Sequence, residues 1–183
     1  MSILKVDTIN EKTTGNGIVI PSGQTLDVSA GTLVPGANQV VQHLITKPTT
    51  KTDFTSTSYT DAAGFSMTIT PKYASSKILI RFWAQTIMNN SGAGNCAHDH
   101  RIMRDSTQIY TTQWRNYFNT AWATSDFYPQ LHTQYIDSPS STSAITYKVQ
   151  GRVYAGGSNR PWTMGDYNGG SYDSVMELLE IKQ

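Results

Sequence analysis

The sequence carries little formal charge for its length. Only 15% of its 183 residues are Asp, Glu, Lys or Arg, and the net charge is +1, whereas roughly 25% of residues are charged in a typical soluble domain. The chain also has no run of basic residues, so the electrostatic signature of a nucleic-acid-binding protein is missing. We therefore expect no nucleic-acid partner.

Cysteine and long hydrophobic runs are equally scarce. The single cysteine, Cys96, excludes an internal disulfide, and we interpret it as a small buried apolar residue. No stretch approaches the roughly 18 apolar residues of a membrane span. The N-terminus lacks the charged and then apolar pattern of a secretory signal. We expect neither membrane insertion nor a signal peptide.

The residues that are abundant favour β-structure. Hydrophobic residues make up 38% of the chain and aromatic residues 10%, which is enough to build a core. Thr and aromatic residues favour strands, and no segment has the pattern of a long helix. The composition and patterning predict an all-β protein.

Residues 1–36 form a first unit of short alternating segments separated by Gly-containing turns. Each segment offers one or two positions for burial, too few to offset the entropy of ordering it in a single chain. Three copies wound about a common axis would cover one another, and we therefore predict a thin intertwined stem. A frayed tail is the alternative. The predicted trimer-interface residues of the stem are Val6, Ile9, Ile18, Ile20, Leu26 and Val28.

Residues 37–183 have longer and more apolar strand patterns. Their spacing predicts an antiparallel β-sandwich head of the jelly-roll type. The last segment could be helical by propensity, but we expect a final strand that closes a sheet edge. Strands are expected at 39–46, 52–61, 65–71, 76–88, 97–112 (a hairpin that turns at 104–107), 127–137, 144–155 and 173–181.

The strongest strand pattern, residues 76–88, has two unequal faces. Residues 78, 80, 82 and 84 are apolar and point one way, which predicts the core. The opposite face mixes polar residues with Trp83 and Ile87, which are too apolar for a freely solvated surface. We expect these two residues to contribute to the trimer interface.

Two irregular regions, 113–126 and 156–172, are long for loops of a compact domain. Loops on a rigid β-scaffold are a usual place for recognition, and aromatic faces can stack on sugars while Arg or Asp binds hydroxyl groups. The alternative is that several of these side chains fill the trimer interface or cap the sandwich. The candidate ligand- or receptor-binding residues are Trp114, Arg115, Tyr117, Trp122, Arg160, Trp162, Asp166, Tyr167 and Tyr172.

Several phrases of the sequence resemble the short trimeric fibre proteins of marine and cyanobacterial bacteriophages. They are "LKVDTI", "NQVVQ", "TSTSYTDAAGFSMTITPKYASSKILI", "RDSTQI" and "DSPSSTSAITYKVQ", which touch the first unit and most of residues 39–155. The resemblance implies a homotrimeric virion protein for host attachment, with an intertwined stem and a β-sandwich head. It implies a location on the phage tail, the baseplate or the capsid exterior.

The sequence begins almost at the first stem strand, which favours a short accessory fibre over a conventional long tail fibre. We expect the stem to dock on other virion proteins and the head to bind a host surface glycan or protein. A capsid-bound head fibre or decoration protein is the first alternative. A polysaccharide-degrading tailspike is the second, although such spikes usually have much longer chains.

The sequence has no nucleophile elbow, P-loop or zinc-protease motif, so we expect no enzymatic activity and no cofactor. His98 and His100 form the best metal candidate, because residues two apart on a strand share a face. Imidazole suits zinc, iron or nickel. The alternative reading is two histidines of a surface or interface. His43 and His132 are interpreted as structural.

Overall fold

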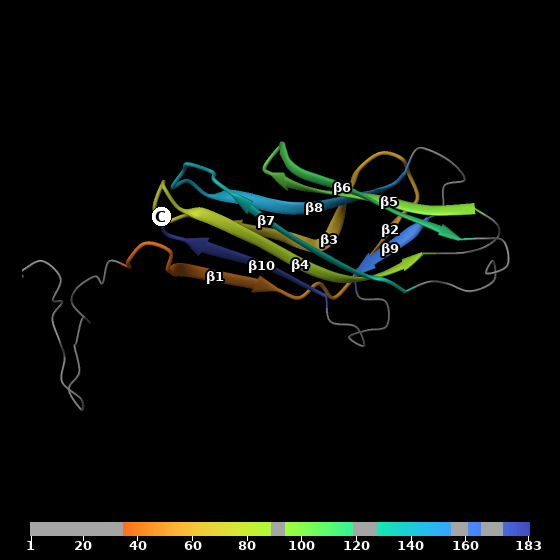
Figure 1. The fold of residues 1–183 in the computed structure, drawn as a ribbon, viewed down its shortest axis with the longest axis horizontal. Helices are drawn as coiled ribbons and strands as arrows, with labels where there is room; N and C mark the ends of the chain where they lie inside the picture. The colour runs from red at the N-terminus through yellow and green to blue at the C-terminus, as the bar shows by residue number, and fades with distance from the viewer. Residues whose placement is uncertain (1–34, 89–93, 119–127, 155–160, 166–173) are drawn as a thin grey trace, which may run out of the picture. The chain divides into compact units, whose positions relative to one another are not determined.

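The chain folds into two antiparallel β-sheets that face each other (Figure 1). The computed structural model describes residues 35–88, 94–118, 128–154, 161–165 and 174–183, with the backbone alone described for 94–98 and 113–118. These described residues form ten strands, which are β1 Val40–Thr46, β2 Lys51–Phe54, β3 Thr60–Ile69, β4 Lys77–Met88, β5 Gly94–Arg104, β6 Thr107–Phe118, β7 Gln130–Asp137, β8 Ile145–Val153, β9 Trp162–Gly165 and β10 Val175–Ile181.

The first sheet is organised around the long strand β4. The order is β1-β10-β4-β9-β2, with β7 paired to the other edge of β4. The first half of β4 lies between β10 and β7, and its last residues, Thr86 to Met88, pair with β9. The second sheet has the order β3-β8-β5-β6. This arrangement bears out the prediction of an all-β chain with antiparallel sheets, consistent with a sandwich.

The core lies between the sheets and follows the predicted alternation. On β4, Ile78, Ile80, Phe82 and Ala84 are each at most 1% exposed, as their shared face predicts. The aromatic ring of Phe82 meets Phe65 of the opposite sheet edge to face, with 6.0 Å between ring centres. Burial of such apolar surface is the main force that holds the sheets together.

A polar cluster at one end of the sandwich joins Asp137 of the first sheet to two residues of the second sheet. Tyr147 Oη of β8 donates to Asp137 Oδ2 of β7 at 2.7 Å, and Arg104 Nη1 of β5 lies 3.0 Å from both oxygens of the same carboxylate. Burial and the Asp137 carboxylate raise the pKa of the Tyr147 hydroxyl above its ordinary value. This cluster joins the two sheets at the end where β4 begins.

Glu180 has a similar role on β10. Its side chain is fully buried, and its Oε1 accepts hydrogen bonds from Ser76 Oγ and from the backbone N–H groups of Lys72 and Tyr73. Gln42 of β1 donates to the other oxygen at 2.6 Å. The carboxylate therefore holds the connection between β3 and β4 against the sheet.

Four predicted elements differ from the structure. The expected strand 52–61 is interrupted, because β2 ends at Phe54 and β3 starts at Thr60. The expected loop 156–172 contains β9, and β6 continues to Phe118 into the other expected loop. The C-terminal segment is a strand as predicted, but β10 lies between β1 and β4 and does not close an edge.

Gly151 allows the two sheets to approach each other at the end where β4 finishes. A Cβ at this position would lie 2.7 Å from Trp162 Cζ2 and 2.8 Å from Phe54 Cζ. The two rings are stacked, with 4.3 Å between their centres, and both are buried. Neither ring can move aside without breaking the stack.

We therefore expect Gly151→Ala to lower the free energy of unfolding by about 1–3 kcal/mol, the usual range for overpacking a core. The measurement is urea unfolding followed by tryptophan fluorescence. Gly36→Ala is the matched control, because a Cβ there meets its nearest neighbour at 3.7 Å. Equal stability of the two variants would contradict the close-approach argument.

Candidate functional site

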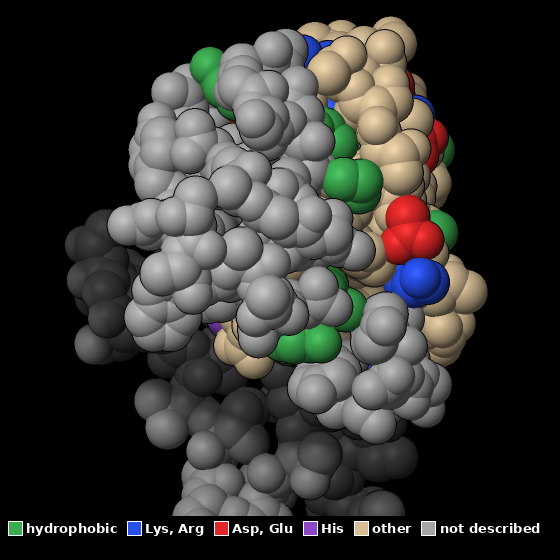
Figure 2. Space-filling model, turned by 90° about the vertical axis from the view of Figure 1, so that its right-hand side faces the viewer, with side chains coloured by type: hydrophobic (Ala, Val, Ile, Leu, Met, Phe, Trp, Pro, Cys, Tyr) green, Lys and Arg blue, Asp and Glu red, His purple; other side chains and the backbone are tan. Residues whose placement is uncertain are grey.

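The two ends of the sandwich differ. Residues 35–39 are bound to the C-terminus by two backbone hydrogen bonds. Asn38 N donates to Lys182 O, and Lys182 N donates to Gln39 O. At the opposite end, β4 finishes, β5 begins and β6 finishes (Figure 1). Viewed from that end, the described surface consists mainly of uncharged groups with scattered charged side chains (Figure 2).

A cavity of about 270 Å³ opens between the edge strands β6 and β7, in the half of the sandwich near the end of β4. Its lining comes from four strands of both sheets. The lining residues are Thr86, His100, Tyr110, Thr112, Gln130, Leu131, His132 and Thr133.

The inner wall of the cavity is fixed by hydrogen bonds. Thr86 is fully buried on β4 and its Oγ1 donates to Pro129 O at 2.8 Å. His100, which is 1% exposed on β5, has its Nε2 2.8 Å from Thr133 Oγ1 on β7. The His100 ring meets Phe82 edge to face at 5.7 Å between ring centres. Both sheets therefore position these groups.

Burial lowers the pKa of His100 from its ordinary value of 6.5 to about 4, because an imidazolium would lose its hydration inside the protein. The ring is therefore neutral at physiological pH and offers one donor and one acceptor nitrogen. The described lining of the cavity consists of hydroxyl, amide, imidazole, aromatic and aliphatic groups, with no Asp, Glu, Lys or Arg among them.

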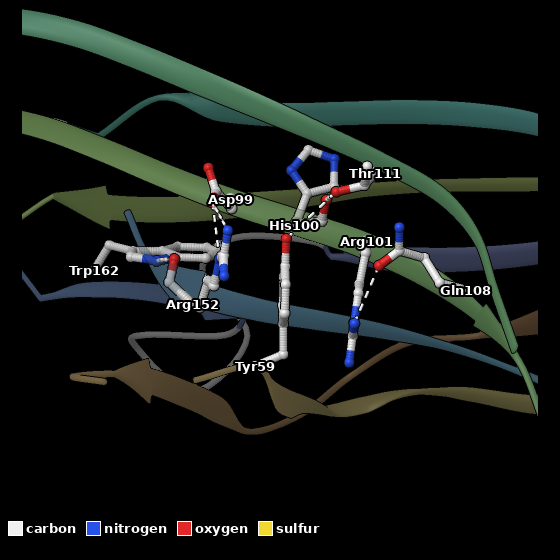
Figure 3. Close-up of polar contacts among 8 residues, drawn as sticks. All are labelled: Tyr59, Asp99, His100, Arg101, Gln108, Thr111, Arg152 and Trp162. Carbon is white, nitrogen blue, oxygen red and sulfur yellow. Dashed lines mark hydrogen bonds and ion pairs between the residues drawn. The ribbon is translucent and has the colours of Figure 1, made fainter. Parts of the chain in front are cut away.

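A second polar cluster lies on the outer face of the β3-β8-β5-β6 sheet. Its central ring is closed to ligands. The ring of Tyr59 lies between the guanidinium groups of Arg101 and Arg152, at 4.0 and 4.4 Å from their central carbons (Figure 3). Both faces of the ring are thus occupied. Arg152 Nε and Nη2 each lie 2.8 Å from Oδ2 of the buried Asp99, and Arg101 Nε donates to Gln150.

We interpret this Tyr59 cluster as structural. The cation–π contacts hold the connection between β2 and β3 on the sheet, where Ser56 O also accepts a hydrogen bond from Val153 N. The strand pattern of residues 52–61 predicts one continuous strand through Tyr59 and therefore does not reveal this cluster. The sequence signal for this cluster is the presence of Arg101 and Arg152 on two strands, β5 and β8, that pair with each other.

The outer face of the first sheet carries an apolar row across three strands. Leu79 of β4 pairs with Leu179 of β10 on one side and with Ile136 of β7 on the other. Ile136 and Ile45 of β1 are both 55% exposed. Beside this row, Arg81 forms an ion pair with Glu177. We call the face that contains these residues the outer apolar face.

The structure corrects one predicted receptor-binding residue and one predicted trimer-interface residue. Trp162 was expected in a recognition loop, but it lies on β9, is 2% exposed and donates from Nε1 to Arg152 O at 2.9 Å. It is a core residue and has no surface for a receptor. Ile87 is only 7% exposed within one chain, so it cannot contribute much to a trimer interface, whereas Trp83 is half-buried on the outer apolar face.

The remaining candidates are not placed by the structure. The backbone of β6 carries Trp114, Arg115 and Tyr117, but their side chains are outside the described residues, as is that of His98. The whole of Trp122, Arg160, Asp166, Tyr167 and Tyr172 lies outside the described residues, as do the stem positions Val6, Ile9, Ile18, Ile20, Leu26 and Val28.

The proposed metal pair receives no support from the described residues. His100 is directed into the cavity wall and its Nε2 is engaged with Thr133. Within the described part of the chain, no group of three or more His, Cys, Asp or Glu could hold a metal ion. No described helix is long and apolar enough to cross a membrane.

No protein-family model matches the chain, and no curated protein is significantly similar to it. The candidate site therefore rests on geometry alone. The cavity residues other than His100 were not predicted from the sequence, because they lie far apart in the chain and meet only at the sandwich edge.

The buried neutral His100 makes stability depend on pH. Between pH 6.5 and about 4, the unfolded chain binds a proton that the folded protein excludes. The free energy of unfolding therefore falls as the pH falls through this window, by up to about 3 kcal/mol from this group.

We expect His100→Gln to remove this component and to flatten the dependence. The measurement is urea unfolding at neutral pH and at about pH 4.5 for both proteins, so that carboxylates common to both cancel in the difference. An equal loss of stability in the two proteins on acidification would contradict the assignment.

Proposed function

We propose that the chain is a homotrimeric virion fibre protein of a bacteriophage, which attaches the particle to a host surface through its head. The observation that supports this most is the difference between the two ends of the head. Residue 35 and the C-terminus lie at one end of the sandwich. At the opposite end, β6 finishes and the chain leaves it towards predicted Trp and Tyr candidates (Figure 1). Such a head can be carried by a stem and still present its recognition end.

The trimer is proposed to form through the outer apolar face as well as through the stem. This face combines exposed Ile45 and Ile136 with half-buried Leu79, Leu179 and Trp83, and a second copy of the chain is the occupant that we favour. The Arg81–Glu177 ion pair beside the row holds its two opposite charges together within one chain.

We propose that the protein acts by binding and without catalysis. The cavity offers hydroxyl, amide and neutral imidazole groups, which suit recognition of a hydroxyl-rich ligand, and its described lining has no pair of carboxylates of the kind that hydrolyses glycosidic bonds. A stem in residues 1–36 that docks on other virion proteins completes the proposal. A capsid-bound fibre or decoration protein is the alternative location.

We expect light scattering of the full chain to give a mass about three times its 20.2 kDa. Ile136→Lys should shift the protein towards the monomer without loss of secondary structure, because a charge would then be buried in the interface. Thr68→Lys is the matched control on the exposed face of the other sheet. A stable monomer of the unmodified chain would refute the trimer.

We expect antibodies against the chain to label intact phage particles at the tail or baseplate. Labelling confined to the capsid would favour the alternative location, and unlabelled particles would contradict the virion proposal. In parallel, incubation of the protein with host polysaccharide should release no reducing sugar. Release above that of a heat-inactivated sample would favour the polysaccharide-degrading alternative.

A further inference from the structure

The cavity between β6 and β7 differs from an ordinary gap at a sandwich edge. Its inner wall is pinned, because Thr86 and Thr133 are both committed to the hydrogen bonds described above. Its rim is open, with Gln130 and His132 exposed and Thr112 half-buried. A ligand would therefore meet a rigid inner wall and a rim of polar groups that can still donate and accept.

The size of the cavity limits the ligand. A volume of about 270 Å³ lies just below the range of roughly 300–1,000 Å³ for sites that enclose drug-sized molecules. It is large enough for one six-membered sugar ring and too small for an oligosaccharide. Any further sugar units would have to lie outside, across the rim.

The charge of the lining limits the ligand further. A carboxylate placed in the cavity would lose hydration, and the described lining provides no Lys or Arg to replace it. A purely apolar ligand would leave the hydroxyl and amide groups of the rim without partners, which is costly when they are buried. Neutral molecules with many hydroxyl groups satisfy both conditions.

We propose that this cavity binds a single uncharged hexopyranose residue, with Thr112 and Gln130 contacting its hydroxyl groups and the ring of Tyr110 lying beside it. The inference deepens the proposed attachment function, on which it rests for its biological meaning, by naming the class of sugar. It excludes uronic and sialic acids as the residue held in the cavity.

The test is saturation-transfer NMR and calorimetry on the full chain, with methyl glycosides of neutral hexoses as probes and glucuronic and sialic acids in comparison. Thr112→Val removes one hydroxyl at nearly constant volume and should weaken the binding about fivefold, as expected for one lost hydrogen bond. Gln130→Ala acts at an exposed position, so it should weaken binding without affecting the fold. Thr60→Val, at an exposed position of β3, is the matched control and should bind like the unmodified chain.

Three results would overturn the inference. They are stronger binding of the acidic sugars, unchanged binding in both cavity variants, and failure of every neutral hexose to bind while the unmodified chain still adsorbs to host cells. The last result would leave the attachment function intact. Neutral-sugar binding by a chain that is absent from phage particles would support the cavity assignment and refute the virion proposal, so the two failures are distinguishable.

Discussion

The stack of Phe54 on Trp162 over Gly151 is the contact on which the arrangement of this sandwich depends. β2 and β9 are only four residues long, so backbone pairing alone gives them little stability. The two rings supply it, because they insert against β8 of the opposite sheet where Gly151 has no side chain. The stack thereby joins the short strands to both sheets. It also holds β9, which pairs with the last residues of β4, in position.

β4 connects this stacked end of the sandwich with the candidate site. β4 pairs with β9 at Thr86–Met88 and with β7 over most of its remaining length. Thr86 consequently contributes both to the pairing with β9 and, through its hydroxyl, to the hold on Pro129 at the start of β7. The cavity wall is therefore set by the same strand that anchors the stacked end of the sandwich.

Alternation of apolar residues was sufficient to predict the main strands and the core face of β4. Successive side chains of a strand point to opposite faces, so residues that are apolar at every second position can only be the buried face. Alternation could not predict β9, which is short and lies between segments rich in Gly. Nor could it predict the burial of Trp162, since a tryptophan in such a segment has the same local pattern whether it binds a ligand or fills a core. The cavity depends on contacts between β4, β5, β6 and β7, whose register is a tertiary property.

The pairing of β1 with β10 has a mechanical consequence. Residues 35–39 leave the sandwich beside the end of β10, and β1 then runs antiparallel to β10 over nearly its whole length. A force that draws Pro35 away along the strand direction loads this ladder in shear, so that its hydrogen bonds resist together instead of opening one after another. Pairing of β1 with β10 therefore lets the sandwich resist a pull along the strand direction at its Pro35 end.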